Sequence, residues 1–431
     1  MNKSVLTSFI ILCLLCSTFL VWIFSTVQKV RGIDQIFIRS DGSVDPPNAP
    51  ISRMNDAVYN FTDNLYHSIV VERSHILVDG AGFTLQGYGG GIGLGLAYRV
   101  NVSICNLQIE QFEWGIEVDR CCNCSISDTI IKENAIGIEL YDSVNNTISR
   151  NNITNNYRDG IVLYYSSKNN ISVNEIANNE HGIRLHESTT NNVSGNNVTN
   201  NGYSFRLYVS SDNSISCNNI KNSDLGIWLN GSSNNNIAYH NNFVNNTFHI
   251  LSERSSSSPW DNGLEGNYWD NYTDKDENRD GVGDTPFELA VNNTDKYPLM
   301  GMFSSYNTSL GYRVNVISNS TIEDFEYLES NSTIKMHVSC VEDYGFCRVT
   351  VAHALMNVSN MSVIIDCGLT PVLYANYTLY SNDTHRWIYF SYQHSIHEVD
   401  IVPEFPLVFI LPLFMIATLL AVVAYRRKRT M

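Results

Sequence analysis

The chain repeats one pentapeptide pattern six times: GIEVD at 115–119, GIELY at 137–141, GIVLY at 160–164, GIRLH at 182–186, SFRLY at 204–208 and GIWLN at 226–230. The first residues of successive pentapeptides are 22 or 23 positions apart. A fixed period in this range indicates a solenoid, in which each unit buries its apolar face only against its neighbours. The stretch 115–247 is therefore predicted to be a stack of similar coils.

Apolar residues recur at four offsets within each unit, counted from the opening glycine, or Ser204, as offset 0. Offsets 1 and 3 alternate along one short strand, and offsets 11 and 16 hold isoleucine or valine; the first unit has Ile116, Val118, Ile126 and Ile131, and the last has Ile227, Leu229 and Ile237. A period of two is typical of a strand with alternate side chains pointing inward. Helical spacings and the repeated leucines of a leucine-rich repeat are absent, so a parallel β-helix is predicted.

Asparagine pairs lie between the apolar positions, at 145–146, 169–170, 191–192 and 234–235. Asparagine tolerates the left-handed backbone of a tight corner, and stacked amides can hydrogen-bond between coils. One more unit opens at Gly93, with apolar residues at the same four offsets: Leu94, Leu96, Ile104 and Ile109. About eight coils are expected.

The repeat, of the form G-I-x-L-x-x-S-x-x-N-x-I-S-x-N-x-I-x-N-N, resembles the right-handed parallel β-helix repeats of the NosD and carbohydrate-binding/sugar-hydrolase type. The segments VDGAGFTLQG at 78–87, GNYW at 266–269 and DGVGDTP at 280–286 also resemble NosD-like proteins. The resemblance implies an all-β fold with a right-handed helix. It implies little about activity, because the recurring residues are core and corner residues.

Changes in composition divide the 431 residues into six segments. We expect a signal peptide or N-terminal anchor at 1–30, a cap region at 31–67, the β-helix at 68–254, an acidic capping segment at 255–303, a β-sandwich at 304–402 and a transmembrane or sorting tail at 403–431. Seven short alternating segments suggest the sandwich. The fold class is therefore all-β, with a hydrophobic helix expected at each end.

Two apolar runs predict the location of the protein. One extends from Val5 to Ser25, and the other, from Leu407 to Tyr425, is followed by Arg426-Arg-Lys-Arg. A run of this length with a basic end crosses a membrane and leaves the preceding residues outside the cell. The tail resembles archaeal sorting tails of the PEF type. In an exported chain, sequons such as Asn60 and Asn101 are glycosylation acceptors.

The net charge of −16 and the pI of about 5.0 argue against a nucleic-acid partner. Eight cysteines lie outside the two apolar runs. Cys121-Cys-Asn-Cys124 follows one pentapeptide closely, and a soft-metal site, a ladder position and a corner bridge are all conceivable there.

The segment after the repeat predicts a Ca²⁺ loop. Oxygen-bearing side chains alternate with other residues around Gly281 and Gly283; the predicted ligands are Asp274, Asp276, Asn278, Asp280 and Asp284. Ca²⁺ takes six to eight oxygens from a short loop with glycine where the loop turns. Phe287 stands where an EF-hand has its bidentate Glu, so dockerin-like and thrombospondin-type loops are the better match. An acidic turn with Asx hydrogen bonds is the alternative.

Offsets 2 and 4 flank an inward residue and are predicted to form an outward column on one sheet. The candidate ligand-binding residues in this column are Tyr141, Tyr164, Arg184, His186, Arg206, Tyr208 and Trp228. Aromatic faces stack on sugar rings, and charges select acidic or hydroxylated groups. Exposed tyrosine is equally common on sheets that bind nothing.

Three functional classes remain open. The first, which we favour, is a membrane-anchored extracellular protein that binds glycans or serves a structural role in the cell envelope. The second is a polysaccharide lyase or glycoside hydrolase, for which Glu139 and Arg184 are the candidate catalytic residues, although no compact acidic cluster is evident. The third, NosD-like copper delivery, has little support because copper(I) favours Met and Cys clusters, and the repeat has no Met.

Overall fold

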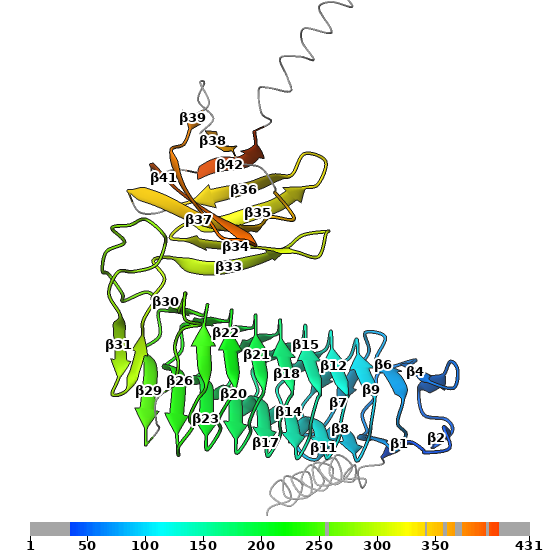
Figure 1. The fold of residues 1–431 in the computed structure, drawn as a ribbon. Helices are drawn as coiled ribbons and strands as arrows, with labels where there is room; N and C mark the ends of the chain where they lie inside the picture. The colour runs from blue at the N-terminus through cyan, green and yellow to red at the C-terminus, as the bar shows by residue number, and fades with distance from the viewer. Residues whose placement is uncertain are drawn as a thin grey trace, which may run out of the picture. The chain divides into compact units, whose positions relative to one another are not determined.

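A computed structural model describes residues 35–254, 258–340, 343–356, 360–366, 373–393 and 396–404, and these contain strands and turns but no helix. The all-β prediction is confirmed (Figure 1). The strands form a parallel β-solenoid of about ten turns and separate antiparallel sheets near the C-terminus. The chain divides into two compact units, residues 1–169 with 178–180, and residues 170–177 with 181–431.

Each solenoid coil contributes one strand to each of three sheets. In the first unit the sheet that carries the pentapeptides contains, in parallel order, β1 (Ile36–Ile38), β5 (Ile69–Val71), β8 (Ile92–Ala97), β11 (Trp114–Asp119), β14 (Ile136–Tyr141) and β17 (Asp159–Tyr164). In the second unit it contains β20 (His181–His186), β23 (Tyr203–Tyr208), β26 (Leu225–Asn230) and β29 (Phe248–Glu253). The other two sheets consist mainly of three-residue strands such as β12 (Ser125–Ser127) and β13 (Ile130–Lys132).

The N-terminal segment expected to be a cap forms strands of the solenoid sheets. β1 pairs in parallel with β5, and β4 (Val58–Phe61) pairs in parallel with β6 (Ile76–Asp79). Two short strands, β2 (Val44–Asp45) and β3 (Ile51–Arg53), then turn back antiparallel at the sheet edges. This extra pairing is one reason that the solenoid has more turns than the eight expected.

The predicted core register is confirmed with one correction. Leu140, Leu163, Ile153 and Ile220 are fully buried, as expected for offsets 3 and 16. Ile237 was expected to point inward, but it pairs with Ser214 and is only half-buried, while Ala238 pairs with Ile215. The coil that opens at Gly226 is one residue longer before this strand, so the inward position falls one residue later.

Two ladders of polar side chains hold neighbouring coils together. The Asn146 Oδ1 atom accepts a hydrogen bond from the backbone N–H of Cys124 at 2.8 Å, and Asn169 Oδ1 does the same for Asn146. Three residues earlier in each coil, Ser143 Oγ accepts from Cys121 N at 3.0 Å, and Ser166 Oγ accepts from Ser143 N. These buried amides and hydroxyls satisfy backbone donors at the corners, where the sheet ladder is interrupted.

The opening glycines have a steric cause. A Cβ atom on Gly115 would lie 2.6 Å from the carbonyl oxygen of Gly137, and one on Gly137 would lie 2.5 Å from the oxygen of Gly160. Offset 0 therefore points inward against the next coil, directly before the inward residue at offset 1. Two consecutive inward residues interrupt the alternation of the strand, so offset −1 lies on the same side of the sheet as offsets 2 and 4. Several residues at offset −1 are nevertheless buried, among them Asp159, His181 and Leu225.

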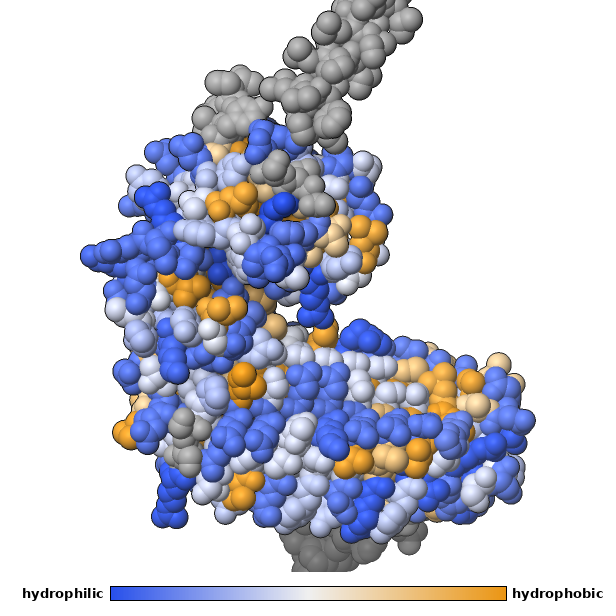
Figure 2. Space-filling model, in the orientation of Figure 1, coloured by the Kyte–Doolittle hydropathy of each residue, from blue (hydrophilic) through white to orange (hydrophobic). Residues whose placement is uncertain are grey.

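The surface of the solenoid seen in Figure 2 is mostly hydrophilic, with scattered hydrophobic patches. Large apolar side chains that are exposed on the solenoid include Tyr88, Tyr157 and Val173. Such side chains are normal on a protein surface when they occur singly. The hydropathy of the surface therefore does not identify a binding site, and a candidate site depends on specific side chains.

Large aromatic residues close the C-terminal end of the solenoid. β30 (Tyr268–Trp269) pairs in parallel with β28 (Asn242–Val244), and Trp269 stacks on Phe243 with ring centroids 4.1 Å apart. Trp269 Nε1 donates to Asp295 Oδ2 at 2.9 Å, and both residues are fully buried. A ring at the last coil covers apolar surface that an open solenoid end would expose.

The following domain is a sandwich of two five-stranded antiparallel sheets. One contains β33 (Met302–Asn307), β34 (Arg313–Ser318), β37 (Tyr344–Ala352), β41 (His385–Gln393) and β40 (Tyr377–Ser381). The other contains β35 (Thr321–Leu328), β36 (Thr333–Ser339), β42 (Ile396–Pro403), β38 (Met361–Asp366) and β39 (Leu373–Tyr374). A single apolar cluster that includes Val316, Met336 and Ile401 fills the space between them.

The two apolar runs at 5–25 and 407–425 lie outside the described residues. Among the residues that are described, no helix is long and apolar enough to cross a membrane.

Candidate functional site

The outward side of β20, β23 and β26 carries three rows of polar and aromatic side chains. We define the aromatic–arginine face by its residues, which are His181, Arg184, His186, Tyr203, Arg206, Tyr208 and Trp228. Arg184 is directly opposite Arg206 in the parallel register, and Arg206 is opposite Trp228. Five of the seven candidate ligand-binding residues lie here, and each of these five is half-buried rather than open.

Ring stacking orders the aromatic–arginine face. The imidazole of His186 stacks on Tyr208 with ring centroids 4.8 Å apart, and the Arg206 guanidinium lies 4.5 Å from the centre of the Trp228 indole. Because these rings lie face to face along the stack, their faces contact neighbouring side chains. The stacking of sugar rings on these aromatic faces stays a prediction.

His181 and Tyr203 belong to this face, and the sequence analysis missed them. Their rings stack at 5.1 Å, and Tyr203 stacks on Trp228 at 5.4 Å. Arg206 Nη1 also lies 3.3 Å from His181 Nε2. Both residues stand at offset −1, which simple alternation from offset 1 places inside. The fixed glycine at offset 0 was the available signal, since a glycine within a strand pattern often marks a bend or a close backbone approach.

Two arginines set the electrostatics of this face. Two guanidinium groups on adjacent strands repel each other, and like charges directly opposite in a sheet are destabilising. Burial lowers the pKa of His186, and the positive charges of Arg184 and Arg206 lower it further, against an opposing effect of Glu187. A negatively charged ligand would relieve this repulsion.

The same sheet in the first unit carries a pair of carboxylates. Glu117 on β11 is directly opposite Glu139 on β14, and Trp114 Nε1 donates to Glu139 Oε2 at 3.1 Å. Burial raises the pKa of Glu117, and the charges of Glu139 and then Asp119 raise it further. The candidate catalytic residues from the sequence were Glu139 and Arg184, two coils apart, and the pair in register is Glu117 with Glu139.

The remaining predicted residues of the column lie in the first unit beside this pair. Tyr141 is opposite Tyr164 in the register of β14 and β17, and both are half-buried. Tyr141 also meets Tyr165 edge to face at 5.7 Å. Glu139 belongs to the first unit and Arg184 to the second, so the acid–arginine pair considered from the sequence stays a prediction.

The Asp-rich loop forms Asx turns. Both carboxylate oxygens of Asp276 accept backbone hydrogen bonds, from Asp280 N at 3.0 Å and Gly281 N at 2.9 Å. Asp280 Oδ1 accepts from Val282 N, and Asp284 Oδ2 accepts from Glu277 N. These hydrogen bonds are the ones expected for an acidic turn, which was the alternative to a Ca²⁺ loop. Ca²⁺ binding by Asp274, Asp276, Asn278, Asp280 and Asp284 stays a prediction.

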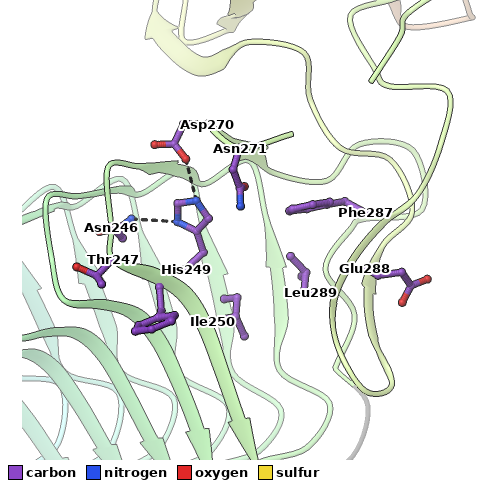
Figure 3. A pocket seen from close by; sticks show the side chains of 10 residues that line it. Asn246, Thr247, His249, Ile250, Asp270, Asn271, Phe287, Glu288 and Leu289 are labelled. Carbon is purple, nitrogen blue, oxygen red and sulfur yellow. Dashed lines mark hydrogen bonds and ion pairs between the residues drawn. The ribbon is translucent and has the colours of Figure 1, made fainter. Parts of the chain in front are cut away.

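A pocket of about 410 Å³ lies at the C-terminal end of the solenoid (Figure 3). His249 on β29 donates from Nε2 to Asp270 Oδ1 at 2.8 Å, and its Nδ1 lies 3.5 Å from Asn246 Nδ2. Phe287 and Leu289 of β31 (Phe287–Ala290) form part of its wall. Both imidazole nitrogens have partners, so His249 is held in place rather than poised as a free base.

The stacked coils and their ladders define the protein as a parallel β-helix. The family described as "Periplasmic copper-binding protein (NosD)" matches residues 60–274, and the solenoid of this chain is related to that family. No curated protein sequence matches the chain.

Solved structures with similar folds are distant. The chain is 13% identical to the Dettilon tailspike protein gp208, in a match that covers 80% of this chain and 86% of that one with a TM-score of 0.39. It is 14% identical to the periplasmic alginate epimerase AlgG (49% and 79% covered, TM-score 0.35). It is 17% identical to DFA-IIIase from Arthrobacter chlorophenolicus A6 (44% and 52% covered, TM-score 0.35). Likenesses this distant concern the fold, so function must be argued from the side chains.

The family description names copper, and the donors of this chain do not form an evident copper site. Among the described residues, no three His, Cys, Asp or Glu side chains are grouped as ligands for one metal ion. The matched region contains no methionine. Cys121 and Cys124 are two soft donors close in the sequence, and both are buried. The donors of the described residues therefore do not fit a copper site.

Proposed function

We propose that the protein binds acidic polysaccharides through the aromatic–arginine face. The observation that carries this proposal is the pairing of Arg184 with Arg206 on adjacent strands. Like charges directly opposite each other in a sheet are destabilising, so an anionic ligand that binds between the two guanidinium groups would stabilise them. Guanidinium groups bind carboxylates and sulfates with two parallel hydrogen bonds, which makes uronic acid or sulfated sugars the preferred class.

The repeat suits a polymer better than a small anion. Neighbouring strands lie about 4.8 Å apart, so successive coils offer equivalent side chains at regular intervals along the stack. Stacking of Tyr203 on Trp228 and of His186 on Tyr208 orders the side chains before any ligand arrives. Ordering in advance reduces the entropy lost on binding.

The test is a glycan array followed by calorimetry with the full chain. Arg184→Gln combined with Arg206→Gln should lower affinity for acidic polysaccharides at least tenfold and leave neutral ones unaffected. Arg254→Gln is the matched control, because Arg254 is an exposed arginine at the end of β29 that lies outside this face. Equal affinity of the double variant and the parent would refute the proposal.

Location belongs to the same proposal. The apolar run at 407–425 with its basic end would hold the protein at the membrane, with the solenoid outside, where envelope polysaccharides occur. Protease shaving of intact cells tests this part. Release of solenoid peptides is expected, and protection of the solenoid until lysis would contradict it.

A second candidate function rests on Glu117 and Glu139. Retaining glycoside hydrolases use two carboxyl groups about 5–5.5 Å apart, close to the strand spacing of about 4.8 Å. One carboxyl with a raised pKa serves as the acid, and its ionised neighbour serves as the nucleophile. Glu117 has the raised pKa, and Glu139 is oriented by Trp114. Glu117 would protonate the glycosidic oxygen while Glu139 attacks the anomeric carbon.

Release of reducing sugar ends from a polysaccharide panel tests this candidate. Glu117→Gln and Glu139→Gln should each abolish the release, whereas Glu113→Gln, an exposed neighbour, should not. If the parent binds polysaccharide and releases no ends, the binding proposal stands alone.

A further inference from the structure

Cys121 and Cys124 occupy positions that carry serine and asparagine in later coils. The equivalent pairs are Ser143 with Asn146, Ser166 with Asn169, Ser188 with Asn191, and Ser210 with Asn213. One coil therefore replaces both polar ladder residues at once, and by the same residue type. Both cysteines are buried, at 1% and 3% exposure.

The sulfur atoms perform the ladder function poorly. Cys121 Sγ accepts from Arg99 N at 3.2 Å, in the place of a serine hydroxyl. Cys124 Sγ lies 3.9 Å from Arg99 O, where an asparagine would supply an amide donor, as Asn146 Nδ2 does to Cys121 O at 3.3 Å. A thiol is a weak donor and a weak acceptor, so hydrogen bonding alone does not account for two cysteines here.

Both sulfur atoms contact the backbone of one residue in the preceding coil: Cys121 Sγ lies 3.2 Å from Arg99 N, and Cys124 Sγ lies 3.9 Å from Arg99 O. The intervening Asn123 has a positive φ of 55°, which turns the chain between residues 121 and 124. Cys122 lies between them, is half-buried, and forms a bridge of the strand type with Val100 and with Val144. Its backbone is thus fixed in the stack.

We propose that Cys121 and Cys124 form a disulfide that closes this corner of the solenoid, in place of the polar ladder. The bond forms by exchange with an external disulfide, such as oxidised glutathione or a disulfide-bonded protein. The Cys124 thiolate attacks one sulfur of that disulfide and expels one thiolate, and the Cys121 thiolate then attacks Cys124 Sγ and expels the second. The protein loses two electrons and two protons, and the external disulfide gains both as two thiols. An exported chain would meet the oxidising conditions that such a bond needs.

Alkylation and peptide mapping of the full chain test this proposal. Cleavage after Arg120 and after Lys132 releases one peptide that contains Cys121, Cys122 and Cys124. After incubation with oxidised glutathione and denaturation, this peptide should take one alkyl group without reductant, on Cys122, and three after reduction. Three alkyl groups without reductant, or a bond that includes Cys122, would overturn the proposal.

A ladder-restored variant supplies the matched control. Cys121→Ser combined with Cys124→Asn installs the pair used by the other coils, so it should fold without a disulfide. Reductant should lower the melting temperature of the oxidised parent and leave that of this variant unchanged. If reductant has no effect on the parent, the two cysteines serve only in packing, and the proposal is wrong. If the thiols stay reduced in oxidised glutathione and bind silver(I) tightly, the pair is a soft-metal site and the proposal is also wrong.

Discussion

Arg206 places its guanidinium 4.5 Å from the centre of the Trp228 indole, one coil further along the solenoid. The same indole stacks on Tyr203, which in turn stacks on His181. These side chains thus stabilise one another across three coils. The face that would bind a ligand therefore also helps to hold the coils together.

Trp228→Ala should therefore affect both stability and binding. A cation–π contact and ring stacking each contribute about 0.5–1.5 kcal/mol, so the free energy of unfolding should fall by about 1–3 kcal/mol. Affinity for acidic polysaccharide should fall as well, because Arg206 loses the surface that orients it. Trp228→Phe keeps a ring and should recover most of both losses. A variant that binds normally despite lower stability would separate the two roles of Trp228.

Leu163→Asp tests the register of the core. Leu163 is fully buried at offset 3 of its coil, and an unpaired carboxylate there costs several kcal/mol. Thermal unfolding should start at a much lower temperature than in the parent. Tyr157→Asp is the control, since Tyr157 is 74% exposed and should tolerate the charge. Equal melting of Leu163→Asp and the parent would contradict the inward assignment of this strand.

The period of the sequence predicted most of the solenoid because it reports which residues must be apolar. The period could not predict the outward face fully. The inward glycine at offset 0 breaks the alternation of the strand, so the residue before it lies on the opposite side from the one that simple alternation predicts. His181 and Tyr203 were missed for this reason, although the close approach of Gly115 to Gly137 gives the rule that places them. Glu117 and Glu139 required only the 22-residue register, which pairs them directly.

The long-range contacts at the C-terminal end have no sequence period to reveal them. Arg348 of β37 pairs with Glu265, 83 residues earlier, and Glu265 Oε2 lies 2.7 Å from His240 Nε2. No repeat relates these residues. In the sequence, Arg348 is only one charged residue within an apolar segment, and nothing there indicates that it is buried or that it pairs with Glu265.

The low pKa of Glu265 in the folded state predicts that the protein loses stability in acid. Burial would raise its pKa, but the hydrogen bond from His240 and the charge of Arg348 outweigh burial and lower the pKa to about 2. A carboxyl with a depressed pKa stabilises the fold above its ordinary value of about 4.5, and that stability is lost as the pH falls toward 2. The contribution is on the order of 3 kcal/mol. Urea unfolding of Glu265→Gln should differ from the parent at pH 6 and converge with it near pH 2; a constant difference would show that Glu265 does not titrate in this range.

The raised pKa of Asp295 predicts the opposite dependence of stability on pH. Burial raises its pKa to about 6, against the hydrogen bonds from Trp269 Nε1 and Asn267 N. The folded state then favours the protonated form, so stability is highest below about pH 4 and falls as the pH rises to about 6. Asp295→Asn should flatten this change between pH 4 and 6, because an amide does not ionise. Melting temperatures measured at half-unit steps check the slope; an unchanged slope in the variant would assign the dependence to another group.

Ca²⁺ should stabilise the loop that follows the solenoid. Burial raises the pKa of Asp276 against its backbone hydrogen bonds, so its charge is costly where it lies, and a bound cation would offset that cost. A ligand that binds only the folded state raises the melting temperature in proportion to its saturation. We expect 1 mM Ca²⁺ to raise the melting temperature of the parent by about 2–4 °C, for a gain of about 1 kcal/mol. Asp276→Ala combined with Asp280→Ala should abolish the increase, while Asp56→Ala, an exposed carboxylate near the N-terminus, should keep it. If EDTA and Ca²⁺ give the parent identical melting curves, the loop is held by its Asx turns without a bound ion.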